Sequence, residues 1–219
     1  MLEVGVLASG EGTNLSALLD ACEKGRIPAR VSLVVCNVPG AGALEKARRA
    51  GVPTALVEHG RYPDRRSFDA AITAELEARG VGLVVLAGFM RILGEDFIRH
   101  WQDRIVNVHP SLLPAFPGMA AARQALDAGV RVAGCTVHLV DAGTDTGPII
   151  AQAAVPVVPG DTEQSLHARI REQEHRLLPE VVGLFAKGLV SVEGRRVAID
   201  LPPDSWPTGV LACPHPDRP

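Results

Sequence analysis

The sequence predicts one α/β domain built on a doubly wound, mostly parallel sheet, with a C-terminal hairpin. Two patterns predict this fold class. Short apolar runs alternate with longer amphipathic segments over the first half of the 219 residues. The runs are apolar almost throughout, as expected of parallel strands that are covered by helices on both faces. Hydrophobic residues make up 47% of the chain, which is enough for a buried core and excludes general disorder.

The first half of the chain supplies strands and helices in alternation. The runs expected as strands are 2–8, 31–36, 83–87 and 104–108. The segments between them carry apolar residues three and four positions apart, which is the spacing of an amphipathic helix. These segments are 15–24, 43–50 and 67–79. Glycines lie at or just beyond their ends, where helix C-caps are expected, at Gly25, Gly51 and Gly80.

The second half contains fewer elements. We expect strands at 136–140 and 154–158, then a helix from about 162 to 187 with Asp161 as its N-cap. Residues 189–199 are expected to form a hairpin that turns near Gly194. Residues 1–201 are therefore expected to form one domain. Residues 202–219 are rich in proline and polar side chains, and we expect an irregular tail.

Charge and cysteine content exclude several classes of protein. The net charge of −3 and the pI of about 6.2 give no concentrated basic surface for nucleic acid. The chain starts with a predicted strand instead of a cleavage signal, and no apolar run reaches membrane-spanning length. The cysteines form no C-x-x-C pair, which argues against a zinc site or a disulfide framework; they are Cys22, Cys36, Cys135 and Cys213. We expect a soluble cytoplasmic protein without membrane, nucleic-acid or metal partners.

A glycine-rich loop, 9–14, lies between the first predicted strand and the first predicted helix. The N–H groups of Gly12, Thr13 and Asn14 at the start of that helix are candidate donors to an anion. The alternative is that the glycines only make a tight turn and that Thr13 or Asn14 only caps the helix. The loop is neither G-x-G-x-x-G, because Leu15 takes the last position, nor a Walker loop. It is typical of a monophosphate site more than of a dinucleotide site.

Asn107 and His109 close a strongly apolar strand, and Pro110 helps to end it. Residues two apart on a strand project to the same face, so these two side chains can converge on one atom at the carboxyl edge of the sheet. Acyl transfer needs such a pair, because donors to the developing oxyanion contribute roughly 2.7–4 kcal/mol each. Histidine can also manage the proton of an attacking amine. The alternative is a structural, hydrogen-bonded histidine.

The segment 141–148 supplies the candidate carboxylates, Asp141 and Asp145. A carboxylate beside His109 would favour the imidazolium form and relay protons through water. The alternative for either aspartate is a turn residue that accepts hydrogen bonds from its own backbone. We favour the turn role for Asp141 and the histidine contact for Asp145, although the spacing leaves open which one reaches His109.

Four segments together resemble the folate-dependent formyltransferase superfamily, and within it the glycinamide ribonucleotide (GAR) formyltransferases. They are 9–15, 86–93, 107–114 and 141–148. The resemblance runs in the same order from Val4 to about Leu189. It implies a Rossmann-like formyltransferase fold and one-carbon transfer in purine biosynthesis. The donor would be 10-formyltetrahydrofolate, without a metal, and the acceptor would be the amine of GAR.

The resemblance also implies roles for individual residues. His109 would be the catalytic acid, Asn107 an oxyanion donor, and Asp145 the carboxylate that keeps His109 charged. The implied contacts to GAR are Gly12, Thr13, Asn14, Arg171 and Glu174. The implied contacts to the folate are Arg65, Met90, Arg91, Ile92, Leu93, Asn107, Asp141, Ala142, Gly143, Thr144 and Asp145.

The residue types agree with these roles but allow others. Apolar side chains in 86–93 suit a flat pterin, yet Leu86 and Met90 equally suit core packing. Arg65 suits a folate carboxylate, but it equally suits a solvated surface. The helix face around Arg171 and Glu174 suits either ribose contacts or plain solvent. We expect small-molecule partners and a monomer or homodimer.

One position departs from the family pattern. The family commonly has a histidine or another polar residue shortly after Pro117-Gly118, and here Ala120 takes that place. An alanine can neither donate nor orient a proton, so we expect a modestly altered site. The alternatives are 10-formyltetrahydrofolate hydrolase, methionyl-tRNA formyltransferase and a non-catalytic folate- or nucleotide-binding module. The first two usually carry an additional domain that is not seen in this sequence.

Overall fold

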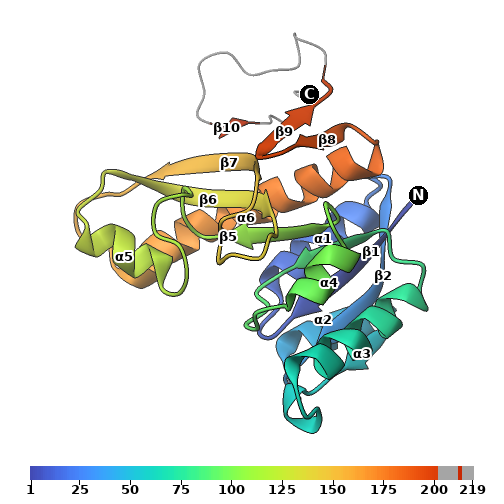
Figure 1. Ribbon diagram of the computed structural model, residues 1–219. Coiled ribbons are helices and arrows are strands. Elements are labelled where there is room, and N and C mark those ends of the chain that lie inside the picture. Colours follow the sequence, from blue (N-terminus) through green and yellow to red (C-terminus); the bar gives the residue numbers. More distant parts are fainter. Residues whose placement is uncertain (202–211, 214–219) are drawn as a thin grey trace.

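The computed structural model describes residues 1–201 and the backbone of 212–213. Within this part, eight strands form one sheet in the order β10-β7-β6-β5-β4-β1-β2-β3 (Figure 1). Its strands are β1 (Leu2–Ala8), β2 (Ala29–Cys36), β3 (Thr54–Leu56), β4 (Leu83–Leu86), β5 (Ile105–His109), β6 (Val132–Leu139), β7 (Ile149–Pro156) and β10 (Ala212–Cys213). A separate hairpin contains β8 (Val190–Glu193) and β9 (Arg196–Ile199).

Parallel pairing extends from β3 through β2, β1 and β4 to β5, and antiparallel pairing continues through β6 and β7 to β10. The strand order reverses between β1 and β4, because β2 lies on the far side of β1. In open α/β sheets, ligands bind beyond the carboxyl ends of the strands at such a reversal. The loops that follow β1 and β4 leave the sheet there. The architecture thus confirms the predicted fold class and its C-terminal hairpin.

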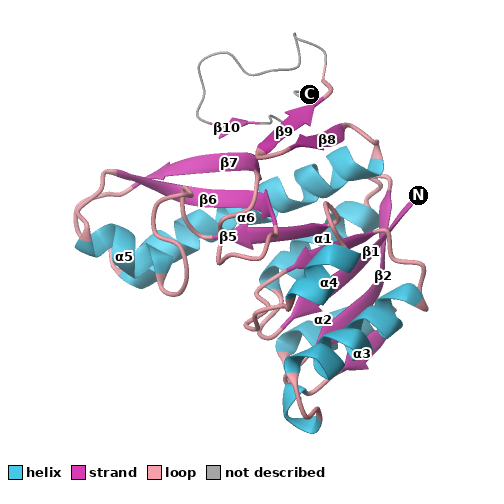
Figure 2. Ribbon diagram, viewed as in Figure 1, coloured by secondary structure: helices cyan, strands magenta, loops and turns pink. Residues whose placement is uncertain are grey.

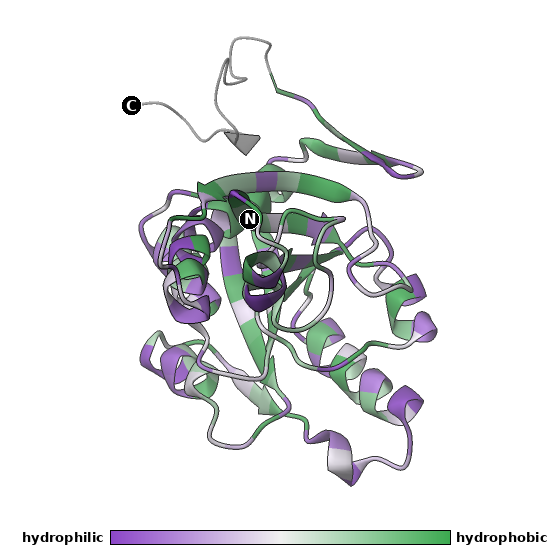
Figure 3. Ribbon diagram, turned by 90° about the vertical axis from the view of Figure 1, so that its left-hand side faces the viewer, coloured by the Kyte–Doolittle hydropathy of each residue, from purple (hydrophilic) through white to green (hydrophobic). Residues whose placement is uncertain are grey.

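Helices cover both faces of the sheet (Figure 2). They are α1 (Thr13–Glu23), α2 (Gly42–Arg49), α3 (Arg65–Glu77), α4 (Glu95–His100), α5 (Ala121–Asp127) and α6 (Glu163–Ala186), with a short 3₁₀ turn η1 (His59–Arg61). Two buried clusters form the core. One packs α1, α2, α5 and α6 against one face, and the other packs α3 and α4 against the opposite face. Figure 3 shows hydrophobic strands inside and helices with alternating hydrophilic and hydrophobic bands.

The 3₁₀ turn η1 and the two-residue β10, which lies in the segment expected to be an irregular tail, were not predicted, and neither were β3, α4 and α5. These last three have 3, 6 and 7 residues. Such short elements contain too few residues for a period of two or 3.6 to be seen. Tertiary contacts stabilise such elements. β3 pairs with β2, and Phe97 of α4 is buried in the second core cluster.

Several boundaries differ from the sequence prediction, including the start of β6 at 132 instead of 136, and two of the differences involve specific hydrogen bonds. β7 covers 149–156 instead of 154–158, because the side chain of Gln152 is accommodated on the sheet by donating to Thr136 Oγ1. Thr162, not Asp161, is the N-cap of α6, and it forms a capping box with Ser165. Asp161 instead accepts hydrogen bonds from the guanidinium of Arg169.

The hairpin prediction over 189–199 is confirmed, with its turn at Gly194 and Arg195. The expectation of an irregular tail falls mainly on 202–211 and 214–219, which lie outside the described residues. Among the helices that are described, none combines the length and the apolar character needed to span a bilayer.

Candidate active site

The end of β5 brings Asn107 and His109 together with His138 of the neighbouring strand β6. Asn107 lies directly opposite His138 in the antiparallel ladder. His138 Nδ1 faces the carbonyl oxygen of Leu139 at 2.8 Å, so this nitrogen carries the proton. His138 Nε2 is then the acceptor for Asn107 Nδ2 at 3.1 Å. This bond fixes which end of the Asn107 amide donates, and its second N–H remains available for a ligand.

His109 is buried, with 5% of its surface exposed, and contacts two acceptors. Its Nδ1 lies 3.3 Å from Oδ2 of Asp145. Its Nε2 lies 2.9 Å from the carbonyl oxygen of Phe116. Only the imidazolium, with a proton on each nitrogen, satisfies both acceptors at once. Each ring nitrogen of His109 therefore faces an oxygen acceptor.

Asp145 is the carboxylate that reaches the histidine. Its backbone is left-handed, with φ of 54°, and Oδ2 also accepts the N–H of Gly118 at 2.8 Å. When His138 is protonated, its Nε2, 3.7 Å from Oδ1, is the group that lowers the pKa of Asp145 most. Burial raises that pKa, while the Gly118 N–H and the charge of His109 lower it further. The net shift is downward, so Asp145 is ionised at neutral pH.

Asp141 has a different place in the same loop. Its Oδ1 accepts the N–H of Gly143 at 3.0 Å and the hydroxyl of Thr146 at 2.6 Å. This is the turn role that the sequence pattern favoured for Asp141. The intervening residues of the loop, 142–144, are exposed. Their backbone is thus presented to solvent beside Asp145.

The segment 90–93 follows β4 at the same edge of the sheet. Met90 and Ile92 are 61% and 67% exposed, whereas Leu93 is buried. The alternative of core packing is therefore wrong for Met90, whereas it holds for Leu86, which is 7% exposed. The N–H of Met90 donates to the hydroxyl of Ser9 at 2.8 Å, which ties this segment to the glycine loop. Large exposed apolar side chains next to polar backbone suit a flat heterocycle.

Arg65 is the first residue of α3 and is exposed. Its Cδ lies 3.4 Å from the position that a Cβ on Gly94 would occupy, so the side chain lies alongside the end of segment 90–93. Arg91, within that segment, is also exposed. Both residues predicted to contact the folate through their charge are thus exposed to solvent.

The glycine loop leads into the N-terminus of α1, with Gly12 as its N-cap. Gly12 has φ of +71°, and a Cβ there would lie 2.8 Å from Cα of Ala43, so both backbone and space require glycine. Thr13 and Asn14 begin α1, but neither side chain caps it. The alternative capping role is therefore wrong for both. Instead, Asn14 Nδ2 donates to Oε2 of Glu174 on α6 at 3.0 Å.

Glu174 is a buried carboxylate, with 4% of its surface exposed. Burial raises its pKa, while the hydrogen bond from Asn14 and the charges of Arg171 and His109 lower it. The alternative of a solvated helix face is wrong for Glu174. Asn14 Oδ1 is buried too, and among the described residues it has no hydrogen-bond partner. Unsatisfied buried polar atoms mark places where a ligand can complete the hydrogen bonding.

Ala120 also has a left-handed backbone, with φ of 57°, and precedes α5. Other groups hold this loop in place of a side chain at position 120. The Gly118 N–H holds Asp145, and Gln124 Nε2 donates to the carbonyl oxygens of Pro117 and Met119. The loop before α5 is therefore anchored without a side chain at 120.

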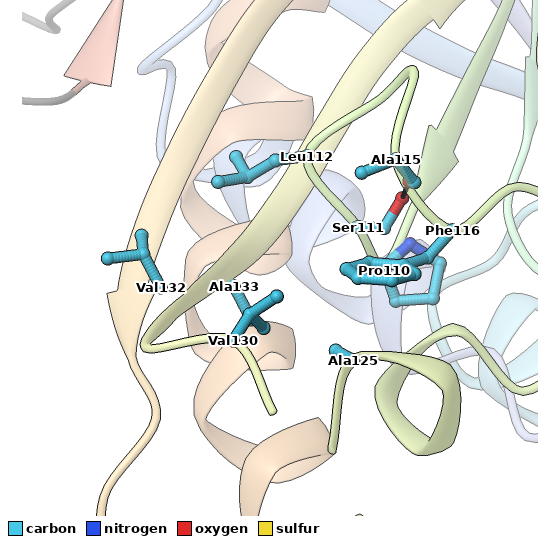
Figure 4. Close-up of a pocket in the computed structure, with 9 residues that line it drawn as sticks. All are labelled: Pro110, Ser111, Leu112, Ala115, Phe116, Ala125, Val130, Val132 and Ala133. Atoms are coloured by element: carbon cyan, nitrogen blue, oxygen red, sulfur yellow. Dashed lines mark hydrogen bonds between the residues drawn. The ribbon is translucent and has the colours of Figure 1, made fainter. Parts of the chain in front are cut away.

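A cavity of about 180 Å³ lies behind this loop, between β6 and α5 (Figure 4). It is lined by Pro110, Ser111, Leu112, Ala115, Phe116, Ala125, Val130, Val132 and Ala133. Apart from Ser111, these side chains are apolar. None of the residues predicted for the site lines this cavity, but Phe116, whose carbonyl contacts His109, does.

Sequence reasoning missed four residues of the site, namely His138, Phe116, Ser9 and Gly118. His138 has a signal in the sequence, since Thr136 and His138 are polar at a spacing of two in an otherwise apolar strand. Phe116, Ser9 and Gly118 had none, because they act through a backbone carbonyl, a tertiary hydrogen bond and a backbone N–H. Over residues 1–201, no three His, Cys, Asp or Glu side chains are grouped as metal ligands.

Comparison with known proteins gives consistent results. The family model described as Formyl transferase matches residues 2–182. The phosphoribosylglycinamide formyltransferase of Mycobacterium tuberculosis is 51% identical over 190 residues, which cover 87% of this chain and 87% of that protein. The crystal structure of glycinamide ribonucleotide transformylase 1 from Symbiobacterium toebii is 55% identical, with a TM-score of 0.90 over 91% of this chain and 94% of that one.

Some relatives are much longer. The trifunctional purine biosynthetic protein adenosine-3 of Drosophila melanogaster is 47% identical over 194 residues. These residues cover 87% of this chain but only 14% of that protein. The chain thus spans about one seventh of the length of that relative.

Proposed function

The chain belongs to the formyl transferase family, and from this premise we propose that it is a phosphoribosylglycinamide formyltransferase. It transfers the formyl group of 10-formyltetrahydrofolate to the amine of GAR in de novo purine biosynthesis. The observation that carries the proposal is the cluster of Asn107, His109 and Asp145 at the strand reversal of the sheet. The glycine loop lies on one side of this cluster and segment 90–93 lies beside that loop.

Asn107 and His109 stabilise the oxyanion that develops when the amine nitrogen bonds to the formyl carbon. Each such donor contributes roughly 2.7–4 kcal/mol to the lowering of the barrier. Asn107 donates with its second N–H, because the first is bonded to His138. His109 donates from Nε2 once the Phe116 carbonyl gives way to the substrate. The reaction ends when the bond between the formyl carbon and the folate nitrogen breaks.

Asp145 holds His109 as an imidazolium and orients its ring. The amine must lose a proton and the folate nitrogen must gain one, so a net transfer between them completes the reaction. Asp145 is ionised and near His109, which suits it to relay this proton through water. The bound folate supplies an activated formyl group, and the protein supplies only orientation and charge.

The proposed contacts to GAR and to the folate lie on different sides of the cluster of Asn107, His109 and Asp145. Gly12, Thr13 and Asn14 bind the phosphate through the N-terminus of α1. Arg171 and Glu174 contact the remainder of GAR, and Glu174 is close enough to His109 for their charges to interact. The folate contacts are those of segment 90–93, Asn107, the loop 141–145 and Arg65. The exposed Met90 and Ile92 support a pterin site there.

The cellular setting is part of the proposal. A cytoplasmic location fits the described thiols of Cys22, Cys36 and Cys135, which form no disulfide. Small molecules are the proposed partners, and the active unit is a monomer or homodimer.

An absorbance assay of the folate product tests the function and separates the alternatives. We expect release of tetrahydrofolate from 10-formyltetrahydrofolate only when GAR is present, and loss of that release in His109→Ala. Equal release with and without GAR would instead establish a hydrolase. Binding of both substrates without any release would establish a non-catalytic module.

A further inference from the structure

Asp69 is a buried carboxylate that has no part in the chemistry above. It lies on α3, with 4% of its surface exposed, among the apolar side chains of the second core cluster. Its Oδ2 accepts the N–H of Gly94 at 2.7 Å. Its Oδ1 is buried and has no hydrogen-bond partner within the described part of the chain. Burial raises the pKa of Asp69, and the Gly94 N–H and the charge of Arg65 oppose that rise.

A buried carboxylate is energetically unfavourable in a hydrophobic core. An apolar residue of similar volume would avoid the desolvation of a charged group. The hydrogen bond to Gly94 is therefore the feature that accounts for Asp69. A charged acceptor makes that bond shorter and stronger than a neutral one would.

The hydrogen bond to Asp69 holds Gly94 in place. Gly94 directly follows segment 90–93 and is the N-cap of α4, so its position sets where the segment ends. There is no room at Gly94 for a side chain. A Cβ there would lie 2.9 Å from Asp69 Oδ2 and 3.4 Å from Arg65 Cδ. Asp69 and Arg65 are one helical turn apart on α3, and together they enclose Gly94.

We propose that Asp69 is a positioning residue for the formyl donor: by holding Gly94 it fixes the path of segment 90–93 against α3. The inference rests on the proposed function, because it takes segment 90–93 as a folate contact. Leu93 is buried and ends the segment, while Met90 and Ile92 remain exposed for a ligand. The bond from Met90 to Ser9 holds the other end of the segment. The segment is thus fixed at both ends, by a serine and by an aspartate.

Two substitutions at Asp69 separate hydrogen bonding from charge. Asp69→Ala removes the acceptor, and we expect the KM for 10-formyltetrahydrofolate to rise about tenfold, the scale of one lost bond to a charged group. The KM for GAR and the kcat should change less than about twofold, since neither the glycine loop nor His109 contacts Asp69. Asp69→Asn keeps an oxygen acceptor, and it should restore most of the affinity for the donor.

Gly94→Ala tests the same contact from the other side. Its Cβ displaces the Asp69 carboxylate without removing it, so it should reproduce the selective rise in donor KM. The matched control is Asp96→Asn on α4, a carboxylate that is exposed and pairs with Arg66 at the surface. This control should leave both KM values unchanged. If Asp69→Ala does not fold, the donor KM values of Gly94→Ala and Asp69→Asn test the positioning role instead.

Equal rises in both KM values, or an unchanged donor KM in Asp69→Ala and Gly94→Ala, would overturn the inference. Calorimetric titration with tetrahydrofolate distinguishes this failure from failure of the proposed function. Weaker tetrahydrofolate binding in Gly94→Ala than in the wild type would support the positioning role even if no formyl-GAR were formed. Unchanged tetrahydrofolate binding would reject that role even in an active transferase.

Discussion

His109 has no free ring nitrogen in this structure, because Asp145 and the Phe116 carbonyl occupy both. The contact with Asp145 can persist through the reaction, but the contact with Phe116 must open for Nε2 to reach an oxyanion. Phe116 has a left-handed backbone, with φ of 56°, which is an unfavourable state for a large side chain. The Phe116 carbonyl thus occupies the ring nitrogen that the proposed mechanism assigns to the substrate.

Asp145→Asn tests whether the carboxylate of Asp145 stabilises a positively charged His109. The amide can still accept the Gly118 N–H, so the loop should keep its path, but it no longer stabilises a positive His109. We expect kcat to fall on the order of 100-fold with both KM values within a few fold, as for loss of acid–base assistance. Steady-state kinetics measures this. Asp127→Asn, an exposed carboxylate on α5, is the control, and wild-type turnover in Asp145→Asn would reject the assignment.

Glu174→Gln is expected to stabilise the free protein at neutral pH while weakening GAR binding. Burial raises the pKa of Glu174, so its ionisation destabilises the fold as pH rises above the unfolded value of about 4.3. Glutamine removes that charge and can still accept from Asn14. Thermal unfolding should give a higher Tm for the variant at pH 7.5, with a difference that shrinks toward pH 4. A lower Tm at both pH values would contradict this.

Residue spacing predicted part of the cluster around His109 and left its other members undetermined. The period of two on a strand sufficed to put Asn107 and His109 on one face. The choice between Asp141 and Asp145 depended on the path of an irregular loop, which spacing does not encode. His138 was missed because it belongs to the adjacent antiparallel strand, whose register a sequence pattern leaves undetermined.

The loop between β6 and β7 carries Asp145, and the hairpin β8–β9 holds it from outside. Arg195 Nη2 at the hairpin turn donates to the carbonyl oxygen of Thr146 at 2.8 Å. The family model ends at residue 182, before this hairpin begins. The hairpin was predicted from its turn, but its contact with the loop was not, because it joins residues 49 positions apart.

Arg195→Ala should loosen that loop without disrupting the fold, since the side chain is exposed. We expect faster amide hydrogen exchange over 142–147 and a donor KM about two- to threefold higher, in line with the small contribution of an exposed contact. Hydrogen-exchange mass spectrometry measures the first effect. Arg196→Ala, one residue further along, is the control. Identical exchange in the two variants would show that the hairpin does not hold the loop.

At the scale of the whole molecule, one edge of the sheet collects three groups of proposed contacts, while Arg65, Arg171 and Glu174 belong to helices. The glycine loop follows β1, segment 90–93 follows β4, and the histidine cluster ends β5. These three strands are adjacent in the sheet, although about a hundred residues separate the first from the last. Sequence reasoning predicted this edge because carboxyl ends of parallel strands lie together. It did not predict the contacts across it, such as Ser9 with Met90.

The fate of the formyl carbon tests the central claim most directly. With 10-formyltetrahydrofolate labelled with ¹³C in the formyl group, and GAR in excess, product can be followed by NMR. We predict that the label appears in formyl-GAR in a ratio of about one to the tetrahydrofolate released, because Asn107 and His109 serve direct attack by the amine. Label found in free formate, with GAR left unchanged, would contradict the account.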